Sequence, residues 1–435
     1  MPSDRSGPPC PLRRGGRLVA AAVIVLAAAL LAAAGASAQT LAGNRFNFNF
    51  SNPGARSLGF GGAFTALADD ATAAFANPAG LVQLTRPEVS VEWRLWDRTP
   101  VFLAGGRADG EPTGMGLDVH EGFVRGRDSS ETLGPSFGSV VVPRGRWCFA
   151  VYGHRLSRFE LASESQGFFS VGDDGSIGRS PALRERVDLD VVSAGLAAAW
   201  RMNDRLRFGL GVVYSDVSLG IATAAFFPDL TTSDGVFEEI PLTPERLGSV
   251  EEAAVDGRDW TVQAGALWSV SDRVTAGLVY RQGAESEGPV RATALFGDET
   301  VVFPGTATFA VPDVVGLGLA YRSANGVVTV AGELDRVGYD GLLRTRLEGV
   351  DIAEREYQDA WEYHLGAEYA LLRLRPILAF RLGGWVEANG DDFVEDRFTH
   401  LAAGLGIAAD SFQIDLGADF SDEVDTLSLS VIYSF

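Results

Sequence analysis

Residues 411–435, SFQIDLGADFSDEVDTLSLSVIYSF, contain two short segments in which apolar and polar side chains alternate. In the second segment, Leu427 and Leu429 are each followed by a serine, and the alternation runs on to Tyr433 and Phe435. A β-strand has a side-chain period of two, so each segment would place apolar side chains on one face and polar ones on the other. The stretch therefore predicts two antiparallel strands joined by residues 421–424.

The same alternation recurs through the chain after residue 38. No run of 18 apolar residues follows that point, so we predict no helix that crosses a bilayer. Most of the alternating segments have the roughly 9–11 residues that a tilted membrane strand needs. The predicted strands are 86–96, 136–143, 146–158, 187–201, 205–219, 258–270, 273–285, 311–322, 326–339, 360–371, 373–386, 397–408, 411–420 and 425–435.

Short and long connections alternate between these strands. The predicted tight turns are 143–145, 202–204, 271–272, 324–325 and 409–410, and the predicted long loops are 97–135, 159–186, 220–257, 286–310, 340–358 and 387–396. Membrane β-barrels have short periplasmic turns and longer external loops. We therefore predict an all-β protein, a transmembrane antiparallel β-barrel of about 14 strands over residues 86–435, multi-pass in the bacterial cell outer membrane. A soluble β-sandwich or propeller would also bury the apolar face, but it does not explain the rhythm of the loops.

The final residue of the sequence is aromatic. A last strand that ends on Phe435 resembles the assembly signal of bacterial outer-membrane barrels, which implies recognition by the barrel-assembly machinery. The alternative is an ordinary edge strand. Tryptophan and tyrosine side chains also lie near many of the predicted strand ends, as the interfacial girdles of a membrane barrel require.

The first 38 residues have the three parts of a secretory signal peptide. Arg13, Arg14 and Arg17 precede an apolar run, and Ala36-Ser37-Ala38 follows it. This order predicts cleavage after Ala38, with an uncleaved membrane anchor as the alternative. Cys10 would leave with the signal peptide, so the mature chain would keep one thiol, Cys148, and no intramolecular disulfide.

Residues 39–85 precede the first strand and lack its periodicity. They are rich in glycine and include DDATAAFANPAGL at residues 69–81. Asp69 and Asp70 favour the start of a short helix that runs to about Phe75, and Asn77-Pro78 would end it. A fourteen-stranded barrel is too wide for its own side chains to fill. We therefore predict that residues 39–85 fold inside the lumen as a plug.

The sequence resembles one known family at this segment. GARSLGFGGAFTALADDATAAFANPAGLVQL (residues 54–84) is similar to the hatch of the FadL-type outer-membrane transporters of long-chain fatty acids and aromatic hydrocarbons, the OmpP1/FadL/TodX-like proteins. Residues 311–340 and 359–385 are similar to strand pairs of the same family. We call residues 39–85 the hatch from here on.

The resemblance implies a mechanism as well as a fold. Extracellular loops would capture a hydrophobic ligand, which would then leave sideways through the barrel wall into the bilayer. Asn77, Pro78 and Ala79, followed by Gly80, match the hatch element that shapes the exit path. Delivery into lipid is favoured because buried apolar surface gains roughly 25 cal/mol per Å². Gly153, in the third predicted strand, is the candidate for a kink that opens the wall, or else a glycine that only lets its neighbours pack.

The candidate ligand-binding residues are apolar side chains of the predicted loops. Phe226, Phe227 and Leu230 lie in the loop 220–257, and Phe102 lies in the loop 97–135. Such loops are unusually apolar for exposed segments, although they could also pack on one another as a cap. Phe46 is added because members of the family place an N-terminal phenylalanine beside the ligand.

Charge and motif content exclude several other classes. The net charge of −21 excludes nucleic acid as a partner. The predicted lumen carboxylates Asp415, Asp419, Glu362 and Glu368 would repel an anion, so a neutral hydrocarbon fits as well as a fatty acid. The four histidines lack metal-ligand spacing, so no metal or other cofactor is predicted. No G-x-S-x-G motif occurs, and we predict that the protein is not an enzyme, with an outer-membrane phospholipase as the alternative.

Two other functions remain open from sequence. PorV-like barrels have similar Asn-Pro-Ala hatches and act as secretion-system shuttles that attach proteins to the cell surface. A general porin for polar solutes is the third possibility, although a plug argues against it. The predicted partners are hydrophobic small molecules and outer-membrane lipid, and we expect a monomer.

Overall fold

The computed structural model describes residues 52–435 except 173, 230, 232–233, 297–298, 351–356 and 388–397. The predicted signal peptide, the first part of the hatch with Phe46, and Leu230 therefore lie outside the described residues. Within the described part of the chain, no helix is long and apolar enough to cross a membrane.

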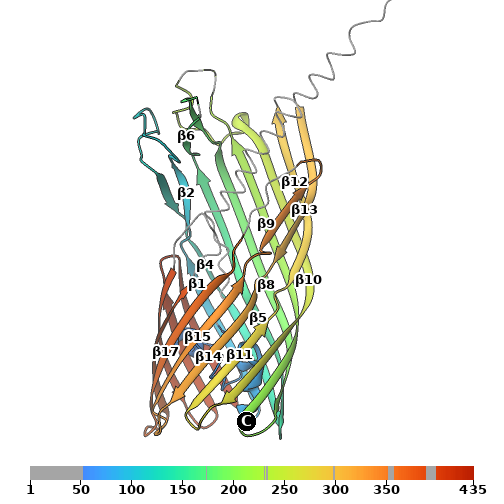
Figure 1. The fold of residues 1–435 in the computed structure, drawn as a ribbon, viewed down its shortest axis with the longest axis vertical. Coiled ribbons are helices and arrows are strands. Elements are labelled where there is room, and N and C mark those ends of the chain that lie inside the picture. The colour runs from blue at the N-terminus through green and yellow to red at the C-terminus, as the bar shows by residue number, and fades with distance from the viewer. Residues whose placement is uncertain are drawn as a thin grey trace, which may run out of the picture.

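Fourteen antiparallel strands form the wall of the molecule (Figure 1). They are β1 (Glu88–Arg98), β4 (Ser130–Arg144), β5 (Trp147–Ser165), β8 (Ala182–Arg201), β9 (Leu206–Phe226), β10 (Leu247–Ser269), β11 (Val274–Arg281), β14 (Asp313–Arg322), β15 (Val328–Gly338), β17 (Ala360–Leu371), β18 (Ile377–Glu387), β19 (Phe398–Ala408), β20 (Phe412–Phe420) and β21 (Val424–Ser434). β1 pairs with β21 on one side and with β4 on the other, which closes the ring. The predicted 14-stranded barrel is confirmed.

Three further strands prolong the wall at the end with the long loops (Figure 1). They are β12 (Glu285–Phe296), β13 (Glu299–Ala310) and β16 (Leu343–Leu347). β12 pairs with β10, and β13 pairs with both β12 and β16. The remaining elements at this end are β2 (Val101–Gly106), β3 (Phe123–Arg127), β6 (Phe169–Val171), β7 (Ile177–Arg179) and the 3₁₀ helix η3 (Pro244–Arg246).

Much of what the sequence predicted as loop is strand. β5 continues to Ser165 and β8 begins at Ala182, within the predicted loop 159–186. β9 and β10 likewise extend into the predicted loop 220–257, and the predicted loop 286–310 is the β12–β13 hairpin. The predicted strand ends were wrong because they assumed the length that a bilayer requires. Hydrogen bonds to neighbouring strands extend these strands beyond that length.

The two faces of the wall differ in polarity as the alternation predicts. On β17 the side chains of Trp361, Tyr363 and Leu365 are exposed on the outside, whereas Glu362 and His364 are buried on the inside. Asp415 and Asp419 are also buried on the inner face. The apolar outer side chains suit a lipid environment. Hydrocarbon cannot hydrogen-bond to the backbone, and in the closed ladder the backbone groups bond to neighbouring strands instead.

The short turns gather at one end of the barrel, where Phe435 also lies (Figure 1). Aromatic side chains form a belt there: Trp147 stacks on Trp200 with ring centroids 6.0 Å apart, and Tyr433 contacts Phe412 at 4.7 Å. Such amphipathic rings prefer the membrane–water interface. The belt therefore marks one boundary of the bilayer.

A charge on the outer face of β18 is expected to destabilise the barrel in lipid. Leu382 is 70% exposed on that face, and an arginine at the bilayer midplane costs about 2–4 kcal/mol. Leu382→Arg should lower the free energy of unfolding by roughly this amount in lipid vesicles. Leu374→Arg, in the β17–β18 turn, is the matched control and should cost about 0–1 kcal/mol. Equal losses for the two variants in denaturant titrations would contradict the assignment of the outer face to lipid.

Candidate functional site

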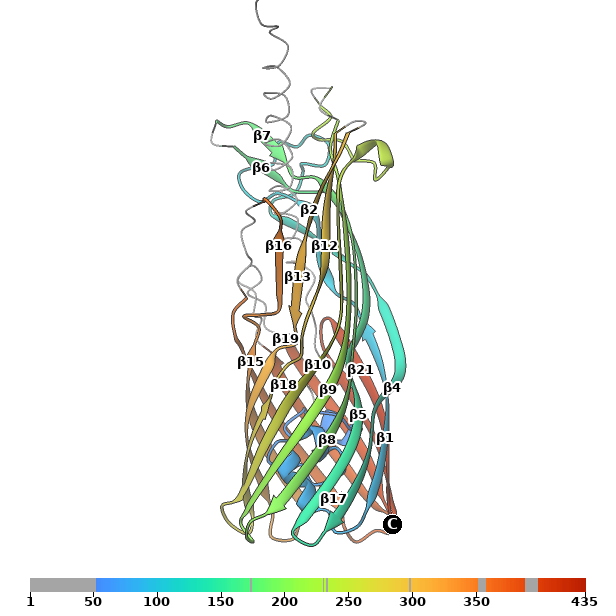
Figure 2. The same cartoon turned by 90° about the vertical axis from the view of Figure 1, so that its right-hand side faces the viewer.

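The described part of the hatch, residues 52–85, lies inside the lower half of the barrel (Figure 2). Its elements are α2 (Ala55–Gly59), α3 (Ala73–Ala76) and the 3₁₀ helix η2 (Pro78–Gln83). The hatch contacts eight wall strands at a glycine in each, and at these positions an added Cβ would lie within 3.1 Å of hatch atoms. These glycines are Gly209, Gly265, Gly277, Gly318, Gly366, Gly383, Gly404 and Gly417. The absence of a side chain lets the two backbones approach closely.

Asn77 anchors the hatch to the wall. Its Nδ2 donates to the carbonyl of Thr65 at 2.9 Å and lies 3.4 and 3.3 Å from the carbonyls of Ala266 and Leu278. Its Oδ1 accepts from the N–H of Ala79 at 3.1 Å, which caps η2, and Pro78 takes the first position of that helix. Asn77 thus joins two parts of the hatch to β10 and β11.

Pro78, Ala79 and Gly80 pack without room for larger groups. A Cβ on Gly209 of β9 would lie 2.3 Å from the backbone of Pro78 and Ala79, and one on Gly80 would lie 2.1 Å from the carbonyl oxygen of Ala68. The structure therefore brings the four residues 77–80 together as one tightly packed element, which we call the NPAG element.

A charged network holds the other side of the hatch. Arg56 bonds Asp69 at 2.6 Å and Glu368 of β17 at 3.3 Å, and Arg322 bonds Asp69 at 2.9 Å. Burial raises the pKa of Asp69, but the two guanidinium groups outweigh this effect and lower the pKa to about 2. Asp70 accepts from the backbone and hydroxyl of Thr72 and also lies 3.5 Å from Arg56. The predicted helix starting at these aspartates is shorter than expected, because α3 begins only at Ala73.

Beyond the hatch, the inner face of the barrel changes from polar to apolar. A buried apolar cluster lines the inside of the prolonged wall, and Phe75 of the hatch packs against it. Its members include Leu156, Phe159, Leu161, Val187, Leu189, Val191, Val217, Leu219, Ile221, Val255, Val290, Phe309 and Val314. At the level of the hatch, by contrast, the inner face carries Glu92, Arg94, Glu333, His364 and Arg381 among other polar side chains.

At this boundary the β4 and β5 strands of the wall cease to be hydrogen-bonded to each other. Their ladder ends at Phe137↔His154, although both strands continue. β5 has a bulge at Leu156, after which the opposite set of residues faces inward, and β4 has one at Ser136. Gly153, the residue that the sequence suggested for a kink, lies in regular register with Gly138 and Ala194. The irregularity thus falls three residues later in β5.

A small cavity lies beside this bulge. It has a volume of about 50 Å³, and its lining includes Phe75, Leu156, Val191 and Arg281. Phe75 also contacts the ring of His154 at 4.3 Å, and the Arg281 guanidinium lies 5.1 Å from the Phe75 centroid. For comparison, an engineered cavity of about 150 Å³ holds benzene. Phe75 therefore restricts the space between the apolar cluster and the hatch.

The sequence model of one protein family, described as outer membrane protein transport protein (OMPP1/FadL/TodX), matches residues 30–385. The chain belongs to this family. It is a family of transport proteins rather than of enzymes, and it places this OMPP1/FadL/TodX protein in the bacterial outer membrane. No curated protein matches the chain in sequence.

Solved structures share the fold of this OMPP1/FadL/TodX protein at low sequence identity. A Pseudomonas aeruginosa FadL homologue has a TM-score of 0.61 at 16% identity, over 86% of this chain and 96% of that one. The Ralstonia pickettii toluene transporter TbuX has a TM-score of 0.61 at 17% identity, over 89% of this chain and 99% of that one. The Pseudomonas putida toluene transporter TodX has a TM-score of 0.59 at 18% identity, over 89% of this chain and 98% of that one.

At the external end of the OMPP1/FadL/TodX protein, the phenylalanines predicted to bind ligand differ in their surroundings. Phe102 lines a cleft of about 530 Å³ together with apolar residues such as Val250 and charged residues such as Glu164 and Arg184. Phe226 is buried against Ala182 and Ile240 instead, and Phe227 packs on Gly248. Of these three phenylalanines, Phe102 is the one that borders a space of ligand size.

A buried ion pair closes one external loop of this family member, residues 107–118. Arg107 bonds Asp118 at 2.9 and 2.7 Å through two nitrogens, and Asp118 also accepts from Thr113. Leu117 donates to the carbonyl of Phe237, whose ring stacks on Phe169. The bidentate pair thus fixes the conformation of residues 107–118, and the Leu117 hydrogen bond joins them to the β9–β10 connection.

Removal of the Asn77 side chain is expected to loosen the hatch without opening the barrel. Asn77→Ala leaves buried backbone groups without their partner, at a cost of about 1–3 kcal/mol. Amide hydrogen exchange in residues 65–84 should become faster, while the unboiled protein keeps its heat-modifiable migration on gels. Asn203→Ala, in the β8–β9 turn, is the control and should leave hatch exchange unchanged. Failure of Asn77→Ala to assemble would show that the NPAG element is needed for folding of the barrel itself.

Acid is expected to release residues 107–118 only well below pH 4. Hydrogen bonding from Arg107 lowers the pKa of Asp118 from 3.8 to about 2. The ionised carboxylate therefore stabilises the folded loop above pH 3.8, and this contribution is lost as the pH falls through about 2. Asp118→Asn removes it at every pH. Pepsin should cut the variant loop faster than the wild-type loop at about pH 4 and equally fast near pH 2, and equal rates at pH 4 would contradict the assignment.

Proposed function

We propose that this protein takes up hydrophobic small molecules, long-chain fatty acids or neutral hydrocarbons, and releases them sideways into the outer membrane. The observation that carries the proposal is the apolar cluster on the inner face of the prolonged wall. A barrel that passes polar solutes has a polar interior. Here buried apolar side chains run along the inside of the prolonged wall as far as Phe75, so a hydrophobic ligand on this path would meet apolar rather than polar groups.

The entry end supports capture from outside. The cleft lined by Phe102 has about 530 Å³, within the usual range for small-molecule pockets. The Arg107–Asp118 pair and the Phe169–Phe237 stack hold the loops around this end in place. A preformed cleft lowers the entropic cost of binding, so it favours capture of a dilute ligand.

The hatch makes a straight path into the periplasm unfavourable. Below Phe75 the interior is filled by the hatch and by polar wall groups that bond to it, such as Glu333 with Thr65 and Glu368 with Arg56. A ligand with about 200 Å² of apolar surface is about 5 kcal/mol more stable in lipid than in water. A sideways exit therefore follows the free-energy gradient.

The end of the β4–β5 ladder supports an exit at that position. It lies where the apolar lining meets the hatch, and both strands are bulged there. The cavity of about 50 Å³ beside Leu156 is too small for an aromatic ring, so passage needs the Phe75 side chain to move. In this role Asn77, Pro78, Ala79 and Gly80 fix the hatch on β9–β11 while Phe75 moves on the β5 side. The toluene transporters of the same fold make aromatic hydrocarbons reasonable first substrates to test.

A negative charge in the apolar lining is expected to block uptake. Leu219 is buried in the cluster on β9, and a buried unpaired carboxylate costs several kcal/mol. Leu219→Glu should reduce uptake of labelled toluene and of labelled oleate into cells by about tenfold or more. Ser218→Glu, on the opposite face of the same strand, is the matched control and should keep wild-type uptake. Heat-modifiable migration verifies that both variants assemble.

Two results would count against the proposal. Equal uptake in wild-type, Leu219→Glu and a deletion strain would show that the barrel does not carry these ligands. If the deletion strain also lost surface-attached proteins, the shuttle function would replace uptake.

A further inference from the structure

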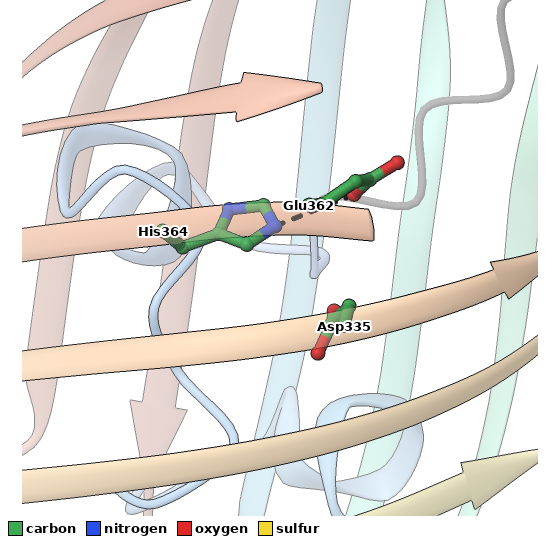
Figure 3. A group of neighbouring side chains, drawn as sticks. All are labelled: Asp335, Glu362 and His364. Carbon is green, nitrogen blue, oxygen red and sulfur yellow. Dashed lines mark hydrogen bonds and ion pairs between the residues drawn. The ribbon is translucent and has the colours of Figure 1, made fainter. Parts of the chain in front are cut away.

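Asp335, Glu362 and His364 form a compact group on the inner wall (Figure 3). Asp335 lies on β15, and the other two lie two residues apart on β17. Asp335 is paired directly with Glu362 across the ladder, and Glu333 is paired with His364. Each of the three residues offers a ligand atom within 4.8 Å of the others, and all three side chains are buried. Neighbouring strands thus bring one imidazole and two carboxylates together.

This arrangement brings two carboxylates together and leaves one carboxylate oxygen without a hydrogen-bond partner. Like charges directly opposite each other in a ladder are destabilising. The Asp335 Oδ1 atom is buried and has no hydrogen-bond partner, and Asp335 is only 3% exposed. Neighbouring Glu333 adds a further carboxylate, whose two oxygens accept from the backbone and hydroxyl of Thr65 at 2.7 and 2.6 Å. The Arg281 guanidinium attracts Asp335 but donates to Asn52 and Ala76.

The hydrogen bonds of His364 orient its second nitrogen toward the carboxylates. Nδ1 lies 3.0 Å from the carbonyl oxygen of Gly61, which only accepts, so Nδ1 carries a proton. Nε2 lies 3.3 Å from Oε2 of Glu362. A lone pair on Nε2 would face a carboxylate oxygen, so a positive species must lie between them. Metal-bound histidines usually donate their other N–H to a carbonyl or carboxylate in this way.

We propose that Asp335, Glu362 and His364 bind one divalent transition-metal cation of the Zn²⁺ type. Imidazole nitrogen favours Zn²⁺ over Mg²⁺ or Ca²⁺, and two carboxylates neutralise its charge in a buried setting. Tetrahedral Zn²⁺ places its ligand atoms about 3.3 Å apart, a spacing that Nε2 and Oε2 already have. Small rotations of the Asp335 side chain complete the set, and water fills the open position. Glu333 is not a ligand because both of its oxygens bond to Thr65.

The cation would strengthen the attachment of the hatch. His364 holds the Gly61 carbonyl, and a Cβ on Gly62 would lie 2.8 Å from its Nδ1. A metal on Nε2 fixes the ring orientation and the proton on Nδ1, and hence the bond to the hatch. The site itself does not depend on which ligand the barrel transports.

Zinc binding to the purified full-length mature protein in detergent tests the site. The protein is dialysed against EDTA, incubated with ZnCl₂, freed of excess metal by gel filtration and analysed by atomic emission. The wild type should retain about one zinc per chain, and Asp335→Asn, which keeps the side-chain volume, should bind zinc at least about tenfold more weakly. Asp419→Asn is the matched control, because Asp419 is also a buried lumen carboxylate bonded to a histidine, His400 at 2.9 Å. It should bind zinc like the wild type.

The second readout is the thermal stability of the folded protein. Zn²⁺ should raise the temperature at which the folded band on gels converts to the unfolded one, EDTA should reverse the shift, and Mg²⁺ should not produce it. Asp335→Asn should show no shift. No retained zinc in the wild type, or equal retention in the wild type and Asp335→Asn, would overturn the proposal and leave a proton between His364 and Glu362 instead.

Discussion

The closure of the strand ladder between β1 and β21 is the constraint on which the rest of the structure depends. Hydrocarbon cannot hydrogen-bond to the backbone, so a sheet in a bilayer must have no free edge. With fourteen strands the ring is too wide for its own side chains to fill. The lumen therefore needs the hatch, and the glycines on eight wall strands let the hatch backbone approach the wall closely enough to fill it.

The hatch in turn divides the interior into two environments. Around it, the inner face is polar because its side chains bond to hatch backbone, as Glu333 does to Thr65 and Arg94 does to Asn52. Beyond Phe75 there is no hatch backbone to satisfy among the described residues, and the inner face is apolar. The wall parts between β4 and β5 at the boundary of these two regions, which connects the fold to the proposed sideways release.

Buried charge on the inner wall is compensated unevenly. Arg381 bonds both Glu368 and Asp415, and one oxygen of Glu92 accepts from Arg94 and Ser428, so each of these carboxylates has a cationic partner. Asp335 and Glu362 face each other across the ladder, and the basic groups that act on Asp335 are His364 and Arg281. Buried charges are retained at a cost unless something pairs with them. Within the described part of the chain, the proposed metal site is the group in which two carboxylates and an imidazole offer ligand atoms within 4.8 Å of one another.

The sequence by itself determined the class of fold. It also predicted that residues 39–85 lie in the lumen, and residues 52–85 of this segment lie inside the barrel. Alternation is a local, period-two signal, so it predicted the fourteen strands, the inner position of Glu362 and Asp415, and the short turns. The NPAG element was found because its four residues are contiguous. The role of these residues in gating stays a prediction.

Tertiary structure alone decided the features that depend on register between strands. The extension of β5, β8, β9 and β10 into predicted loops follows from ladder bonds with neighbours, and so does the bulge at Leu156 rather than at Gly153. The separation of Phe226 from the cleft that Phe102 lines could not be seen in the chain. The histidine spacing suggested no metal site, because Asp335 and Glu362 are 27 positions apart in sequence and become neighbours only through the β15–β17 pairing. Pairing register is a non-local property, set by the closed ring as a whole rather than by any one strand.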